Sequence, residues 1–379
     1  LSECAAREAA SEAPQPTGAS RAEAQAVDGD SDRLPGTYYL PQSPASSIPA
    51  AMRCFGIEEA VEIAREVLED CVYLRHGVCL GPGDTVVDVG ANIGLFCLLC
   101  LAGPTSAACE GSAPGIGSCS DGALPPGAQG IAGEAQLPAS QPSDAGRKKR
   151  SRRTAGWHGP PAKIYAIEPL PPICEALAHN LKQMEACGIA LPQQVELLRL
   201  GVGSQGPSTE CDFTFYPHMA GNSTCIPEEK ADQYSEMNPA LRDGCFADSS
   251  TFTCKVASLS HVLQAHGIDR VDLLKIDNEG SELTALLGIR DEDWHRIRQV
   301  VVEVHPRDGR LSAVTGLLSS KGFETLVGPD GSSPSSEERQ RVGTEEQGSS
   351  MSALIVYATR KKLGGASNAG HTEPVGEAM

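Results

Sequence analysis

The segment TVVDVGANIGLF at residues 85–96 places an acid and two glycines where an apolar strand gives way to a turn. Asp88 follows two β-branched residues, and Gly90, Asn92 and Gly94 come at alternate positions after it. In an open parallel sheet, ligands bind beyond the carboxyl ends of the strands, where a glycine-rich turn lets backbone N–H groups approach them closely. The glycines allow that approach, and the Asp88 carboxylate can either order the turn or bind a cationic group.

A second acid ends the next apolar strand along the chain. YAIEPL at 165–170 carries Glu168 at the position from which a carboxylate accepts hydrogen bonds from both ribose hydroxyls of an adenosine. Together the two segments indicate a nucleoside-like cofactor. A dinucleotide site needs G-x-G-x-x-G, whereas Asn92 stands at the second glycine position here, so the spacing excludes NAD. An ordinary tight turn between strand and helix is the alternative that the spacing leaves open.

A family resemblance rests on these residues and on a later motif. The pattern D-x-G-x-N-x-G with a following acid resembles motif I of class I S-adenosylmethionine-dependent methyltransferases. VDLLKIDNEGSELTALLGI at 271–289 resembles the signature of the FkbM family, as do AIEP, the DW at 293–294 and VVVEVHP, in the same order. The resemblance covers roughly 70–360. It departs from the family in an insertion at 103–162 and in Asn278, where the family usually carries an apolar residue.

The resemblance implies both a fold and an activity. The fold is α/β, a Rossmann-like, seven-stranded, mostly parallel sheet in the order 3-2-1-4-5-7-6, with helices on both faces and the last strand antiparallel. The activity is transfer of a methyl group from S-adenosyl-L-methionine to a hydroxyl on a small molecule, polyketide or sugar. Methylation of a protein or RNA, and a non-catalytic cofactor-binding module of a larger protein, stay open as alternatives.

Methyl transfer to an oxygen requires alignment of acceptor, methyl and sulfur, and removal of the hydroxyl proton from a poor nucleophile. Asp277 ends the fourth strand, and the resemblance implies that it lies beside the reactive methyl. There it acts as a base, as an aligning acceptor, or as a metal ligand with Asn278 and Glu279. The structural alternative is capping of the helix that begins near Ser281, and we prefer it for Glu282.

Two histidines are further candidates for the base. His305 ends the fifth strand, and His218, within YPHMAGNST, is expected on a lid over the acceptor, with Asn222 and Ser223 as polar contacts. No metal site is assigned. The cofactor-binding residues that the resemblance implies are Asp88, Gly90, Asn92, Gly94, Glu168, Val202, Asp277 and Glu279.

The elements that must position these residues alternate between strand and helix, which predicts a parallel sheet covered on both faces. IEEAVEIAREVLED at 57–70 predicts an amphipathic helix, with Val61 on its apolar face. The segment 211–225 breaks the alternation and predicts a hairpin or a loop cap over the sheet. The expected strands lie within 81–90, 162–170, 195–202, 271–280, 297–306, 322–327 and 352–360.

Composition limits the partners. The formal net charge of the 379 residues is −18, which argues against a protein that coats nucleic acid or anionic membranes, so small or neutral partners are expected. The 14 cysteines are expected to be reduced thiols, and Cys97 and Cys100 to pack in the core. The longest apolar run, 93–102, is far shorter than the ~20 residues that span a bilayer. A soluble protein with no membrane span is therefore expected, and its oligomeric state is left open.

Composition also divides the chain. Residues 1–35 and 363–379 are expected to be disordered, and so are the insertions 103–162 and 330–350, which interrupt one methyltransferase-like domain at 36–362. An intracellular, cytoplasmic location is expected. The basic run RKKRSRR at 147–153 favours the nucleus as the alternative, or a nucleic-acid contact, although such a run is more often solvated.

Overall fold

The computed structural model describes residues 38–39, 49, 52–105, 156–235, 239–329 and 353–360. The segments 1–35, 330–350 and 363–379 and the basic run 147–153 lie outside the described residues, as does 106–155 of the expected insertion. Within the described residues, no helix is long and apolar enough to cross a membrane.

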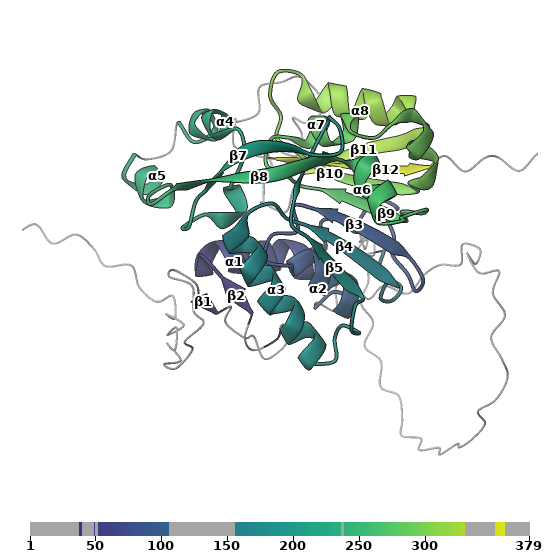
Figure 1. The fold of residues 1–379 in the computed structure, drawn as a ribbon, viewed down its shortest axis with the longest axis horizontal. Helices are drawn as coiled ribbons and strands as arrows, with labels where there is room; N and C mark the ends of the chain where they lie inside the picture. The colour runs from purple at the N-terminus through teal and green to yellow at the C-terminus, as the bar shows by residue number, and fades with distance from the viewer. Residues whose placement is uncertain are drawn as a thin grey trace, which may run out of the picture. The chain divides into compact units, whose positions relative to one another are not determined.

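The central feature is a seven-stranded sheet in the order β11-β12-β10-β9-β3-β4-β5 (Figure 1). β12 runs antiparallel to both β10 and β11, and the pairs joining β10, β9, β3, β4 and β5 are all parallel. This is the predicted order 3-2-1-4-5-7-6 with its last strand antiparallel, so the predicted fold is confirmed. The strands are β3 (Thr85–Val89), β4 (Lys163–Ile167), β5 (Val195–Leu198), β9 (Leu273–Ile276), β10 (Gln299–Val304), β11 (Phe323–Pro329) and β12 (Leu354–Arg360).

Helices cover both faces of the sheet (Figure 1). Because side chains of a strand alternate between faces, Val86 packs with α1, α2 and α3, while Val87 packs with α6, α7 and α8. The first group comprises α1 (Ile57–Ala64), continued by the π-helix η1 (Arg65–Glu69), α2 (Leu95–Ala102) and α3 (Pro171–Ala186). The second comprises α6 (Leu259–Ala265), α7 (Glu282–Leu287) and α8 (Arg310–Ser320). Val61 of α1 is 43% exposed, so the buried face of this helix is narrower than predicted.

A smaller sheet in the order β6-β8-β7 lies between β5 and β9 in the sequence. β7 (Thr209–Phe215) pairs antiparallel with β8 (Ser250–Ser258), and β6 (Gly201–Gly203) pairs parallel with β8. The expected third strand is therefore two strands in different sheets. A Cβ at Gly201 would lie 2.9 Å from Cζ of Phe213, so the glycine permits the close approach of this segment to β7.

The remaining elements are short. β1 (Tyr38–Tyr39) and β2 (Arg53–Cys54) form a two-stranded pair. The connection from β7 to β8 contains η2 (Ala220–Asn222), α4 (Pro227–Gln233) and α5 (Pro239–Cys245), and η3 (Asp291–Arg296) leads into β10.

The end of the expected insertion belongs to the folded domain. Trp157 forms a bridge with Leu80, and its Nε1 donates a 2.9 Å hydrogen bond to the carbonyl of Cys100. Residues 156–162 therefore pack on the domain, although they fall within the insertion expected at 103–162. Cys97 and Cys100 are fully buried, as predicted.

Candidate active site

A cavity opens at the carboxyl ends of β3, β4 and β9, which we call the first cavity. Six of the eight residues expected to bind a cofactor line it: Gly90, Asn92, Glu168, Val202, Asp277 and Glu279. Asp88 and Gly94 do not line it. Residues far apart in the sequence thus meet where ligands bind in open parallel sheets.

The turn after β3 forms the floor of the first cavity because its glycines admit the neighbouring backbone. Gly90 has φ +76°, and a Cβ there would lie 1.7 Å from the carbonyl oxygen of Asp277. The N–H groups of Gly90 and Ala91 both donate to the carbonyl of Ile167 at 3.0 Å. At Gly94, with φ +94°, a Cβ would lie 2.7 Å from Leu177, so this glycine serves the packing of α3.

The buried amide of Asn180 on α3 anchors the same turn, a role that sequence reasoning missed. Its Nδ2 donates to the carbonyls of Ile93 at 2.8 Å and Arg53 at 3.0 Å. Its Oδ1 accepts from the N–H of Arg53 at 2.6 Å. This side chain therefore ties α3 and β2 to the loop that begins α2.

Glu168 lies at the end of β4 with 5% of its surface exposed. Oε2 accepts a hydrogen bond from the N–H of Asn92 at 3.1 Å, and Oε1 accepts one from the N–H of Leu170, also at 3.1 Å. Burial raises the pKa of Glu168 to about 7, although both amides act to lower it. Each carboxylate oxygen has a second lone pair, so these bonds leave acceptor capacity toward the first cavity.

Asp88 binds a cationic group, one of its two predicted roles, but that group is the side chain of Lys275. Both residues are buried, and Lys275 Nζ lies 3.4 Å from Asp88 Oδ1 and 3.2 Å from Asp277 Oδ2. The same Nζ donates to the carbonyl of Gly90 at 2.9 Å. Burial alone would lower the pKa of Lys275, but Asp277 and Asp88 outweigh it and raise the pKa. Lys275 therefore stays charged and joins the ends of β3 and β9.

Asp277 presents one side of its carboxylate to the first cavity. Its Oδ2 is held by Lys275 and by the hydroxyl of Tyr73, which donates at 3.0 Å. Within the described ranges, no donor contacts Oδ1, and 22% of the side chain is exposed. This geometry leaves a carboxylate oxygen free to accept a hydrogen bond or a proton.

Glu303 of β10 lies behind Asp277 and was not singled out as a site residue by sequence reasoning. Its Oε2 lies 2.7 Å from the same Tyr73 hydroxyl oxygen, within hydrogen-bond distance. Burial, reinforced by the charge of Asp277, raises the pKa of Glu303 to about 8. The sequence signal was the alternation E-x-H at 303–305, which puts Glu303 and His305 on the same face of the strand.

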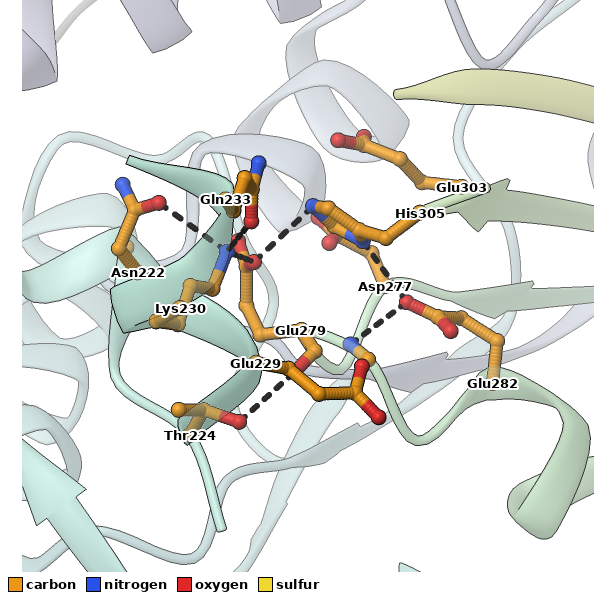
Figure 2. A network of polar contacts seen from close by, with 12 residues as sticks. Asn222, Thr224, Glu229, Lys230, Gln233, Asp277, Glu279, Glu282, Glu303 and His305 are labelled. Atoms are coloured by element: carbon orange, nitrogen blue, oxygen red, sulfur yellow. Dashed lines mark hydrogen bonds and ion pairs between the residues drawn. The ribbon is translucent and has the colours of Figure 1, made fainter. Parts of the chain in front are cut away.

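Glu279 lines both the first cavity and a second one, and its polar contacts are drawn in Figure 2. It has φ +53°, a backbone conformation that a non-glycine residue adopts only when its surroundings impose it. Lys230 Nζ forms an ion pair with its carboxylate, and Thr224 Oγ1 donates to its carbonyl at 2.7 Å. Burial alone would raise its pKa, but Lys230 and His305 outweigh burial and lower the pKa of Glu279 to about 2.

His305 is held between two carboxylates (Figure 2), which argues against its predicted role as a base. Nε2 lies 3.2 Å from Glu279 Oε2, and Nδ1 lies 2.9 Å from Glu282 Oε1. Burial alone would lower the pKa of His305, but the two carboxylates raise it well above the ordinary value. Both ring nitrogens then carry protons, so no lone pair is left to accept another. Glu282 also accepts from the N–H of Gly280 at 2.8 Å at the start of α7, in line with the capping role preferred for it.

The second cavity lies between α4 and the segments that follow β9 and β10. Its wall contains Lys230, Glu279, His305 and Arg310. Arg310 Nη2 pairs with Glu229 Oε2 at 2.6 Å, so positive and negative groups alternate along this wall. Glu279 is the charged residue common to both cavities.

His218 lines neither cavity. Its side chain is 51% exposed and lies 3.3 Å from Asp248, which places it on the surface instead of over an acceptor. Its neighbours do form a wall of the first cavity, as Gly221 and Ser223 show. Asn222 faces Lys230, to which its Oδ1 is an acceptor at 3.2 Å (Figure 2).

No group of three or more His, Cys, Asp or Glu side chains in the described part of the chain is arranged to hold a metal ion. Asp277 and Glu279, which the sequence left open as metal ligands, have Lys275 and Lys230 as their respective ion-pair partners.

Comparison with known proteins finds a matching family model and similar proteins. The model of the methyltransferase FkbM domain matches residues 149–325. Methyltransferase sdnD of Sordaria araneosa is 34% identical over 177 residues, which are 44% of this chain and 66% of that protein, about two thirds of its length. The 31-O-demethyl-FK506 methyltransferase FkbM of Streptomyces tacrolimicus is 29% identical over 288 residues, covering 72% of this chain and 85% of that protein.

Among solved structures, the methyltransferase FkbM of Methylobacillus flagellatus is 14% identical, with a TM-score of 0.38, over 77% of this chain and 47% of that chain. The family-model match contains the motif at 271–289. The chain belongs to the FkbM family of S-adenosylmethionine-dependent methyltransferases.

Proposed function

We propose that the chain binds S-adenosyl-L-methionine in the first cavity and methylates a hydroxyl oxygen of a small molecule. The observation that carries the proposal is the convergence of the Gly90 turn, Glu168 and Asp277 on one cavity at the carboxyl ends of β3, β4 and β9. Family membership supports the reaction class, and the arrangement of these residues supports this cavity as its location.

The residues of the first cavity fit the proposed methyl donor. A Cβ at Gly90 would lie 1.7 Å from the Asp277 carbonyl oxygen, so only glycine lets this turn pack against the segment that carries Asp277. Glu168 offers carboxylate oxygens to ribose hydroxyls, and Asn92 borders the same cavity. When bound, S-adenosyl-L-methionine supplies an electrophilic methyl group on a sulfonium.

Asp277 is the proposed proton acceptor. Lys275 and Tyr73 fix Oδ2, so the carboxylate keeps its orientation while Oδ1 accepts the hydroxyl proton of the methyl acceptor. A positioned general base typically contributes about 10²–10⁴-fold to the rate. Glu279 remains ionised beside it because Lys230 and His305 neutralise its charge.

The acceptor is proposed to enter through the second cavity, because Glu279 belongs to the walls of both cavities. The charged groups there pair with one another, which favours an acceptor with hydroxyl groups over a strongly charged one. The Streptomyces relative is named for a 31-O-demethyl compound, and this supports an oxygen as the atom that receives the methyl group.

Two measurements test the proposal. Thermal unfolding in the presence of S-adenosyl-L-methionine, S-adenosylhomocysteine or NAD should show stabilisation by the first two, and stabilisation by NAD alone would overturn the cofactor assignment. Incubation with methyl-labelled S-adenosyl-L-methionine and a fractionated lysate should then place label in the small-molecule fraction. Label confined to protein or RNA would overturn the acceptor class.

A further inference from the structure

The hydroxyl of Tyr73 contacts two carboxyl groups, one of which, Asp277, lines the first cavity. The hydroxyl oxygen of Tyr73 is 3.0 Å from Asp277 Oδ2 and 2.7 Å from Glu303 Oε2. Both distances are those of hydrogen bonds, and each bond needs its own proton. The phenol carries one proton, and two ionised carboxylates carry none. One of the two carboxyl groups must therefore be protonated for both bonds to exist.

The distribution of cations decides which carboxyl group holds the proton. Lys275 Nζ lies 3.2 Å from Asp277 Oδ2 and stabilises Asp277 as an anion. Glu303, by contrast, forms no ion pair with a Lys, Arg or His side chain among the residues that the structure describes. The proton between these residues is therefore assigned to Glu303. Burial, which raises the pKa of Glu303 to about 8, acts in the same direction.

The surroundings of Glu303 support this assignment. On the neighbouring strand β12 it stands opposite the apolar Ile355. Asp277 and Glu279 raise its pKa by their negative charge, while the positive charge of His305 lowers it. The titratable and charged groups that interact with it are Tyr73, Tyr234, Lys275, Asp277, Glu279 and His305.

We propose that Glu303 is a positioning residue for methyl transfer. In its neutral form it donates its proton to the hydroxyl oxygen of Tyr73, which in turn directs its own proton to Asp277 Oδ2. Two donors, Tyr73 and Lys275, then hold Oδ2 and leave Oδ1 for the acceptor hydroxyl. This inference rests on the proposed role of Asp277 as the base.

Loss of the Glu303 proton reverses the chain of hydrogen bonds. The new carboxylate accepts the Tyr73 proton across the shorter, 2.7 Å contact, and Asp277 loses one of its two donors. A negative charge with no ion-pair partner of its own then lies beside Asp277. The competent form is the protonated one, so activity is present below the pKa of about 8 and is lost as pH rises through it.

Substitution of Glu303 by glutamine keeps a hydrogen-bond donor at this position and removes the ionisable group. In Glu303→Gln, the amide still donates to Tyr73 but does not ionise. The measurement is the initial rate of label transfer from methyl-labelled S-adenosyl-L-methionine into the small-molecule fraction, from pH 6.5 to 9.5. Wild type should lose about tenfold between pH 7 and 9, as a single ionisation near pH 8 requires. Glu303→Gln should keep most of the rate at both pH values. Glu303→Ala should be slow throughout, as should Tyr73→Phe.

A spectroscopic measurement on the full chain without acceptor tests the proton directly. Subtraction of the Glu303→Gln infrared spectrum from that of wild type should leave a protonated-carboxyl band at pH 6.5 that disappears with a midpoint near pH 8. The subtraction removes the bands of other buried carboxyl groups such as Glu168, whose pKa is about 7. Absence of that band at pH 6.5 would overturn the assignment of the proton.

The outcomes separate this role from the function on which it rests. Absence of any label transfer by wild type would overturn the proposed function and the role of Glu303 with it. Transfer with an unchanged alkaline decline in Glu303→Gln would overturn the role of Glu303 alone.

Discussion

The imidazole of His305 lies 3.2 Å from the carboxylate of Glu279, and this contact joins the segments that follow β10 and β9. The other ring nitrogen pairs with Glu282, so one cation lies between two buried carboxylates. The arrangement makes His305 a fixed positive charge in the wall of the second cavity. Its chemistry is therefore that of an ion-pair partner.

We expect His305→Ala to lower the free energy of unfolding by about 3–5 kcal/mol, because it removes the cation between two buried carboxylates and leaves Glu279 with Lys230 alone. The pKa of His305 is raised in the folded state, so its contribution is complete below the unfolded value of about 6.5 and is lost as pH rises through the raised value. Urea unfolding at pH 6 and pH 10 measures this, and the difference between the two proteins should shrink at pH 10. His218→Ala, an exposed control paired with Asp248, should cost less than about 1 kcal/mol. Equal costs for the two variants would contradict the interpretation.

Glu168→Ala should weaken binding of S-adenosyl-L-methionine on the order of tenfold to a hundredfold, because a charge-assisted hydrogen bond contributes about 1.5–3 kcal/mol. The rate at saturating cofactor should change little. The variant should also unfold more easily, since the N–H groups of Asn92 and Leu170 lose their acceptors. Calorimetric titration gives the affinity, with Glu196→Ala on the adjacent strand β5 as the control. An unchanged affinity for Glu168→Ala would remove this residue from the binding site.

Asp277→Asn keeps the shape of the side chain but removes the base. The rate of label transfer should fall by about 10²–10⁴-fold, with cofactor affinity nearly intact. Lys275 retains Asp88 and the carbonyl of Gly90 as partners, so the fold should tolerate the change. If affinity falls and the rate at saturation stays normal, Asp277 belongs only to the binding pocket.

Gly90→Ala and Gly188→Ala form a matched pair. Both glycines have positive φ, +76° and +72°, but a Cβ at Gly188 meets nothing within 4 Å, whereas one at Gly90 meets the Asp277 carbonyl. Gly188→Ala should cost about 1–2 kcal/mol of stability from the left-handed backbone alone. Gly90→Ala should cost about 1–3 kcal/mol more from overpacking and should also abolish cofactor stabilisation. Similar melting temperatures for the two variants would show that the turn has room to move.

Replacing 106–155 with a short Gly-Ser linker should leave the melting temperature nearly unchanged. A Cβ at Gly103 would lie 3.0 Å from the Trp157 ring, so the two ends of this stretch are already neighbours, and loop-closure entropy depends weakly on loop length. Deleting 103–162 should destabilise the domain because it also removes Trp157 and its bond to Cys100. The two deletions can be compared by thermal unfolding. A shorter deletion that is as destabilising as the longer one would contradict this explanation.

The strand order was predictable because the motifs resemble those of the FkbM family in the same order, and that resemblance implies the order of the strands. The turn at Gly90 and the acid at Asp277 were expected at the ends of adjacent strands, and the close approach of Gly90 to the Asp277 carbonyl shows why. Trp157 was missed because the composition of the whole segment 103–162 does not reveal a single aromatic residue near its end that packs on the domain. The division of 195–202 into two strands was missed because apolar periodicity does not reveal which sheet a strand joins.

The polar contacts of the site were harder to predict from the sequence than the fold. Tyr73 and Glu303 are 230 positions apart, and only the folded chain shows that one hydroxyl serves two carboxyl groups. The role of His305 depends on the left-handed backbone of Glu279, which no residue preference predicts. The motifs therefore predict where the site lies, whereas the roles of its side chains depend on long-range hydrogen bonds and ion pairs.

The position of 106–155 in the chain divides the first cavity between two sequence segments. Gly90 and Asn92 precede this stretch, whereas Glu168 and Asp277 follow it. A single proteolytic cut within it would produce two fragments, neither of which contains a complete cofactor site. Methyl transfer by the cut protein would consequently report on non-covalent complementation, with the pairing of β3 to β4 and β9 as the interface that restores the enzyme.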